Sequence, residues 1–116
     1  TPALFIDPDP AQLAAALQAQ APQVEIHTGR YCDASTDAAR ADELMLIANF
    51  AAIASEAGLE VHAGHGLTVD NVGPVAAMPE IVELNIGHAI IARSVFIGLP
   101  AAVAEMRRRM REARGQ

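Results

Sequence analysis

The sequence contains no lysine and no tryptophan, and only four of its 116 residues are Phe or Tyr. Strands of β-sandwiches are rich in aromatic and β-branched residues, so this scarcity argues against a sandwich. Apolar residues still make up 52% of the chain, and many of them are alanine. Small apolar side chains favour helices packed closely on a sheet. The length suffices for one domain with a hydrophobic core and is too short for two.

Positive charge is scarce except at the C-terminus. All eight basic residues are Arg, and five of them lie in the last ten residues. Residues 1–106 carry three Arg and thirteen Asp or Glu, a net charge of −10. A surface of this sign repels phosphate backbones, which argues against a nucleic-acid partner. The Arg-rich end is interpreted as a solvated helix face, with an oligomer contact as the alternative.

Cysteine occurs only once, as Cys32, so no disulfide forms within the chain. No apolar run approaches the roughly 20 residues of a membrane span, and no signal peptide opens the sequence. We therefore expect a cytoplasmic protein without a membrane segment. Thr1 stands directly before a strand-like segment, and we expect the protein to begin upstream of it.

One short pattern occurs three times: Glu, an aliphatic residue, His or Asn, any residue, Gly. The copies are EIHTG at 25–29, EVHAG at 60–64 and ELNIG at 83–87. Side chains alternate between the two faces of a strand, so the Glu and the His or Asn of each copy share a face. Three strands with a polar stripe ending in glycine indicate a repeat built around one polar site.

The chain alternates between strand and helix signals. Strands are expected at 3–7, 24–28, 59–63 and 81–86, and helices at 11–20, 37–57, 88–97 and 100–114. Residues 29–35 and 64–68 are expected to be loops, and Asp70 is expected to cap a short helix that ends at Pro79. This order predicts a parallel sheet. Polar residues on one strand face favour the interior of a (β/α)8 barrel, but a barrel needs about 250 residues, so the prediction is half a barrel.

His65 is the strongest candidate for chemistry. It lies between two glycines just past a strand end, and a loop histidine can act as a proton shuttle; the alternative is a turn histidine. Glu25 and His27 share a strand face, where a buried carboxylate is either catalytic or part of a structural polar pair. For His62 and Asn85 the structural role is preferred, and Glu60 and Glu83 are expected nearer the bottom of the barrel.

Gly87 and His88 join the last strand to a helix. Free N–H groups at a helix start form a phosphate site, and phosphate sites in barrels often follow the last strands. Asp7 either lines the same mouth or begins a turn. Four histidines permit a metal-hydrolase interpretation, but their spacing matches no compact ligand motif, so we expect no metal. Cys32 lacks a local histidine partner, which disfavours a nucleophilic role.

Five segments resemble, in order, the C-terminal half of the pyridoxine 5′-phosphate synthase family. They read LFIDPD, VEIHTGRYCDA, VHAGHGLTVDNV, ELNIGHAIIARSVFIGL and AVAEMRRRMREARG. The resemblance implies a (β/α)8 TIM barrel that condenses 1-deoxy-D-xylulose 5-phosphate with 3-amino-2-oxopropyl phosphate. The products are pyridoxine 5′-phosphate, phosphate and water, and this transferase of vitamin B6 biosynthesis uses no cofactor. It also implies a symmetric homo-oligomer, typically an octamer, in the bacterial cytoplasm.

The resemblance assigns roles to five residues. His65 matches the proton donor and Glu25 the carboxylate that stabilises the transition state. Gly66, Gly87 and His88 match positions that bind 3-amino-2-oxopropyl phosphate.

The remaining catalytic groups of the family, a histidine base and a second glutamate, belong to the N-terminal half of the barrel. Residues 1–116 are therefore expected to form one segment, strands 5 to 8, which needs a companion carrying strands 1 to 4 and is inactive by itself. Two alternatives stay open: another phosphate-binding TIM-barrel enzyme, and a non-catalytic half-barrel that serves assembly.

Overall fold

The computed structural model describes residues 3–115, without the side chains of Ala3, His88 and Ala89. Its elements follow the order β1 (Ala3–Ile6), α1 (Pro10–Gln18), β2 (Gln23–His27), α2 (Gly29–Asp33), α3 (Asp37–Glu56), β3 (Glu60–Gly64), α4 (Val72–Ala76), β4 (Ile81–Asn85), α5 (Gly87–Ile97) and α6 (Leu99–Ala113). The predicted alternation of strands and helices is confirmed. Each of the four strands lies within one residue of its expected bounds.

The four strands form one parallel sheet in the order β1-β2-β3-β4. The register of the sheet places four residues side by side in one row: Phe5, Glu25, His62 and Glu83. Side chains that share a row share a face, so the polar face predicted from the repeat is confirmed for β2, β3 and β4, whereas β1 contributes the apolar Phe5. A register shift follows Val61, where β3 and β4 pair irregularly.

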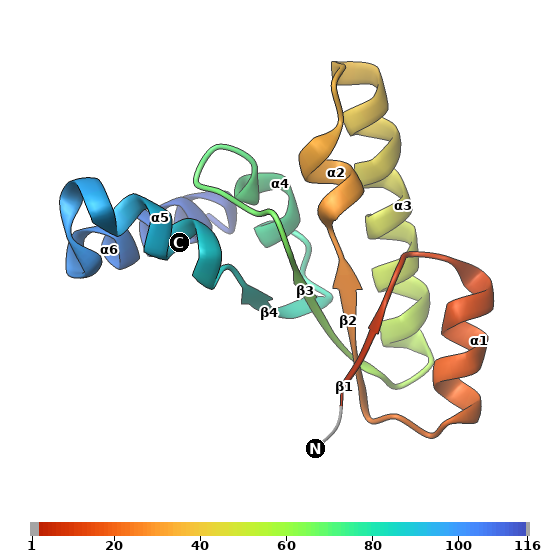
Figure 1. Cartoon of the computed structure of the whole chain (residues 1–116). Helices are drawn as coiled ribbons and strands as arrows, with labels where there is room; N and C mark the ends of the chain where they lie inside the picture. The colour runs from red at the N-terminus through yellow and green to blue at the C-terminus, as the bar shows by residue number, and fades with distance from the viewer. Residues whose placement is uncertain (1–2, 116) are drawn as a thin grey trace.

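One face of the sheet carries the hydrophobic core. Val24 and Ile26 of β2 and Val61 and Ala63 of β3 are fully buried, whereas Glu25 between them is only partly buried. The core side packs against the apolar faces of the helices, which include Ala51 of α3. In Figure 1, α1 and α3 lie alongside β1 and β2, on one flank of the sheet. On the opposite face, Phe5 keeps 57% of its surface exposed.

Local signals account for the helix boundaries. Asp9 accepts a hydrogen bond from the Ala11 N–H and Pro10 occupies the first turn of α1. Thr36 caps α3 by accepting from the Ala39 N–H. Gly58 follows the end of α3 with φ of +90°, the left-handed conformation that ends many helices at glycine.

Two local predictions were wrong. Residues 29–33 form the short helix α2 instead of a loop, because the Cys32 N–H donates to the Thr28 carbonyl and closes a helical turn. Asp70 does not cap α4. Asn71 occupies that position, and its side-chain oxygen accepts from the Thr68 N–H instead of from the helix.

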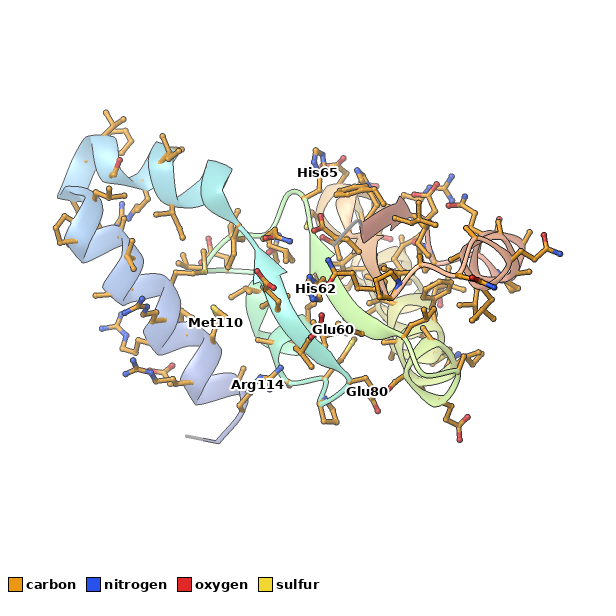
Figure 2. All side chains as sticks on the ribbon, turned by 90° about the horizontal axis from the view of Figure 1, so that it is seen from below. Glu60, His62, His65, Glu80, Met110 and Arg114 are labelled. Atoms are coloured by element: carbon orange, nitrogen blue, oxygen red, sulfur yellow. The ribbon has the colours of Figure 1, made fainter. Side chains whose placement is uncertain are left out.

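The last two helices form a hairpin that projects beyond β4 (Figure 1). Arg114, just after α6, returns to the body: its guanidinium donates to the carbonyls of Ala76, Met78 and Ile81. Figure 2 shows Arg114 pointing from the end of α6 toward the beginning of β4. The five arginines of this end are exposed, as expected of a solvated face, and Arg114 is also anchored by these hydrogen bonds. Within the described residues, no helix is long and apolar enough to cross a membrane.

Candidate active site at the carboxyl ends of the strands

The ends of three adjacent strands bring the polar residues together. His27 ends β2, Gly64 ends β3 and Asn85 ends β4, and these three residues are partners in the sheet register. His65 follows directly after Gly64. Carboxyl ends of parallel strands lie at one edge of the sheet, so the site forms there. Asp7, after β1, begins a turn: its carbonyl accepts from the Asp9 N–H at 2.7 Å.

The backbone of His65 is held in an uncommon conformation. Its φ is +87°, in the left-handed region that costs free energy for a residue with a side chain. The hydroxyl of Thr28 lies 2.7 Å from the His65 carbonyl and 2.8 Å from the Gly64 carbonyl. Thr28 is fully buried, and its N–H also donates to the Gly64 carbonyl at 2.9 Å. These contacts from the end of β2 hold the turn that presents His65.

The rings of His27 and His65 stack. Their centroids lie 4.4 Å apart with an interplanar angle of 25°. The Gly29 N–H donates to Nδ1 of His27 at 3.2 Å, and the ring of Phe5 meets His27 edge-on at 5.4 Å. A β-carbon on Gly29 would lie 2.5 Å from Cε1 of His27 and 3.1 Å from Cδ2 of His65. The absence of a side chain at Gly29 therefore makes room for the stack.

Glu25 lies beside the same turn. The side-chain amide of Asn85 donates to Oε1 of Glu25. A β-carbon on Gly64 would lie 3.1 Å from Oε2 of Glu25 and 2.9 Å from the Asn85 carbonyl oxygen. Glycine at this position lets the carboxylate and β4 approach the residue that precedes His65. The site thus combines a carboxylate, fixed by an amide, with a histidine on a constrained turn.

The predicted phosphate-binding residues lie on two segments, the loop after β3 and the start of α5. The helix begins at Gly87, one residue before its expected start, and the side chain of His88 lies outside the described residues. Gly66 has φ of +80° and lies beside His65. A pocket of about 620 Å³ extends from His65 and Gly66 past Asn85 to Arg93 of α5. The Nε of Arg93 is paired with Glu105 at 3.1 Å.

Residues 1–112 match the model of a protein family described as pyridoxal phosphate biosynthesis protein PdxJ. The chain belongs to this family. The match spans every described strand, and it confirms the resemblance that the sequence motifs indicated. Membership in the PdxJ family connects the chain with the biosynthesis of vitamin B6.

The candidate site has supporting residues whose contacts sequence reasoning did not predict. Thr28 was expected only to end a strand, and for Asn85 a structural role was preferred. Their positions next to the turn follow from the pairing of β2, β3 and β4, which no local motif encodes. One signal was available: both residues lie within copies of the repeat, immediately before or two residues before its glycine.

His62 lies away from this turn. It is 8% exposed, with Nε2 at 3.2 Å from Glu60 and Nδ1 at 3.4 Å from Glu83. Figure 2 shows His62 and Glu60 along β3, separated from His65 on the loop. This geometry favours the structural role expected for His62.

Cys32 packs under the His65 turn. Its Sγ lies 3.6 Å from the His65 carbonyl oxygen, and a β-carbon on Gly66 would come within 3.2 Å of the sulfur. Burial raises the pKa of the Cys32 thiol above its ordinary value, which makes it a poor nucleophile at neutral pH. Within residues 3–115, leaving aside the side chains that are not described, no three His, Cys, Asp or Glu residues are grouped to hold a metal ion.

Proposed function

We propose that this chain provides strands 5 to 8 of a pyridoxine 5′-phosphate synthase. The enzyme joins the amine of 3-amino-2-oxopropyl phosphate to the ketone of 1-deoxy-D-xylulose 5-phosphate. Ring closure with loss of phosphate and water gives pyridoxine 5′-phosphate. The observation that carries the proposal is the constrained His65 turn beside Glu25 in a chain that matches the PdxJ family over residues 1–112.

His65 is proposed as the proton donor. Phosphate and water leave more readily when an acid supplies a proton, and imidazole can do so near neutral pH. Glu25 is proposed to stabilise the transition state. A fixed carboxylate favours a cationic imine, and the hydrogen bond from Asn85 keeps this carboxylate in place before the charge develops.

Gly66, Gly87 and His88 are proposed to bind 3-amino-2-oxopropyl phosphate. The start of α5 supports this role, because the first N–H groups of a helix have no partners within the helix and attract anions. Gly66 lies next to His65 in the same turn, and both line the pocket that reaches Ile86, the residue before Gly87. A phosphate bound in this pocket would place its organic part near the proposed donor.

The barrel is proposed to be completed by its N-terminal half. β1 and β4 each have one sheet neighbour among the described residues, and the polar face opposite the core carries exposed Phe5. Strands 1 to 4 would pair with both edges, cover this face and bring the family's remaining catalytic groups. Residues 1–116 would then be one half of a single TIM-barrel domain.

A homo-oligomer, with an octamer as the form that the family resemblance suggests, is also part of the proposal. The side chains of Ile91, Val95 and Phe96 on α5 are largely exposed, with Phe96 81% exposed. Apolar surface of this kind is typical of protein interfaces. The proposed location is the cytoplasm, where thiols are kept reduced and free cysteines such as Cys32 are common.

The test is product formation by the assembled enzyme, with both barrel halves present. Pyridoxine 5′-phosphate is measured chromatographically after mixing the two phosphorylated substrates. His65→Ala is expected to lower kcat by about 10² to 10⁴, the usual contribution of a general acid. Glu25→Gln keeps the shape but removes the charge, and is expected to lower kcat by about 10² or more. Full activity of His65→Ala would favour a non-catalytic assembly role, and absence of product from the parent enzyme would favour a different substrate.

A further inference from the structure

His27 contacts the proposed proton donor directly, although the sequence and the family resemblance assign it no role. Its ring faces that of His65 at 4.4 Å between centroids. We propose that His27 is a positioning residue, whose stacked ring holds the ring of His65 in the orientation for proton donation. This proposal rests on the function proposed above, because it gives His65 that task.

The turn alone leaves the ring of His65 poorly constrained. Gly64 and Gly66 flank the residue, and both His65 and Gly66 have positive φ. Thr28 holds the carbonyl groups of the turn, but that contact reaches the backbone and not the imidazole. A proton donor must point at its acceptor, and a displacement of about 1 Å can cost on the order of 10² in rate. The stack with His27 supplies the missing constraint on the ring.

The ring of His27 is itself held from two directions. The Gly29 N–H donates to its Nδ1, and Phe5 packs edge-on against it. A ring nitrogen that accepts a hydrogen bond carries no proton, so the contact with Gly29 fits a His27 ring whose proton is on Nε2. A ring in this form places no positive charge beside the ring of His65. The face of a neutral aromatic ring also attracts a neighbouring cation.

Three substitutions of His27 separate the ring face from the hydrogen bond. His27→Ala removes both, His27→Asn keeps an acceptor for the Gly29 N–H, and His27→Phe keeps an aromatic face. In the assembled enzyme, Ala and Asn are expected to lower kcat about 10- to 100-fold while KM for both substrates changes less than about threefold. Phe is expected to retain most of the parent kcat. Parent-like kcat in Ala overturns the proposal, as does a result in which Asn is active and Phe is not.

His62→Asn provides a matched control. His62 lies on the same sheet face as His27, but its ring contacts Glu60 and Glu83. The substitution should therefore leave kcat within about twofold, even if it lowers stability. An equal loss of kcat in His62→Asn and His27→Ala would indicate a general effect on the sheet and overturn the specific role of His27.

Imidazole NMR signals give a readout that does not depend on product. In the assembled protein, the Hδ2 signal of His65 should move downfield in His27→Ala and His27→Asn, because a proton over a ring face loses shielding when the ring is removed. The signal should move little in His62→Asn. An unchanged His65 signal in His27→Ala overturns the stack even if the parent enzyme makes no product. A shifted signal together with no product from the parent contradicts the proposed function and leaves the His27–His65 contact standing.

Discussion

The missing side chain of Gly29 leaves the space in which the rings of His27 and His65 stack. Gly29 has no positive φ, so its backbone would accept alanine, but a β-carbon would lie 2.5 Å from Cε1 of His27. We expect Gly29→Ala to displace the His27 ring and to lower kcat of the assembled enzyme about 10- to 100-fold. The accompanying loss of stability should be about 1–3 kcal/mol, the usual cost of overpacking. Steady-state kinetics and chemical denaturation measure the two effects.

Gly73→Ala is the control for Gly29→Ala. A β-carbon on Gly73 would meet its nearest neighbour, the β-carbon of Ala113, at 3.9 Å, which is ordinary contact. Because Gly73 lies within α4, alanine there should leave stability unchanged or raise it by up to about 1 kcal/mol. If Gly29→Ala behaves like Gly73→Ala in both measurements, the stack does not constrain the site.

Tyr31 provides a prediction about pH. Its hydroxyl donates to the Asn71 carbonyl at 2.7 Å, and burial, followed by the neighbouring Cys32, raises the pKa of the phenol above its ordinary value near 10. The folded state thus holds the phenol proton more tightly than the unfolded state. This contribution to stability is complete below about pH 10 and is lost as pH rises through the raised folded value. As the pH rises from about 9 to 11, the stability of Tyr31→Phe should therefore fall less than the stability of the parent.

The measurement compares thermal unfolding midpoints of parent and Tyr31→Phe from about pH 9 to pH 11. The difference between their ultraviolet absorbance titrations isolates the Tyr31 phenolate, since this chain has one tyrosine. A phenolate that forms below its ordinary range, or equal alkaline slopes in the two proteins, would contradict the prediction.

The candidate site residues could be predicted from the sequence more readily than the contacts that hold them in place. His65 and Glu25 could be predicted because alternation along a strand and flanking glycines are local properties. The contacts of Gly29 and Gly64 could not, because each leaves room for side chains from other segments far along the chain. The positive φ of His65 was also missed, since it depends on hydrogen bonds from Thr28, 37 residues away.

Among the elements, α6 packs on the core through Met106 and is anchored at its end by one further side chain. Arg114 donates to three carbonyl groups at the end of α4 and the beginning of β4. Hydrogen bonds from a charged donor contribute about 1.5–3 kcal/mol, and the partial exposure of this group favours the lower value. We expect Arg114→Ala to destabilise the assembled protein by about 1.5 kcal/mol. Chemical denaturation measures the change.

Arg108→Ala is the matched control on the same helix. Arg108 is exposed and lies 3.8 Å from Glu112, one turn later. Such surface pairs contribute about 0.3–0.5 kcal/mol, so the substitution should have little effect. Equal losses in the two variants would show that Arg114 does not hold α6 against the body.

Element order was predictable because Pro, Gly and capping residues mark helix ends locally. Asp9 and Thr36 act as such signals. The helix α2 was not predictable from periodicity, since it spans only five residues and depends on the Thr28 carbonyl. Asp and Asn are equally common capping residues, so the sequence did not distinguish Asp70 from Asn71. In the structure the Thr68 N–H donates to the side chain of Asn71, which occupies the position before α4.

At the scale of the whole molecule, the sheet has two edges and an uncovered face. β1 and β4 present unpaired backbone groups on one side each within the described residues, and such edges promote association. Phe5 on the uncovered face and Val82 on β4 are more than half exposed. In a closed barrel, additional strands would pair with both edges and cover Phe5. Stability and solubility should therefore depend on the companion half.

We expect the chain produced alone to aggregate or to unfold without cooperativity, and to become soluble when produced together with a segment carrying strands 1 to 4. Native mass spectrometry and denaturation of both samples measure this difference. Val82→Lys tests the role of the β4 edge. A charge on an edge strand opposes pairing with another strand. The substitution should therefore reduce aggregation of the chain alone and also weaken its complex with the companion. A cooperative, folded monomer with the mass of this chain alone would contradict the half-barrel, because its edges and polar face would then need no partner.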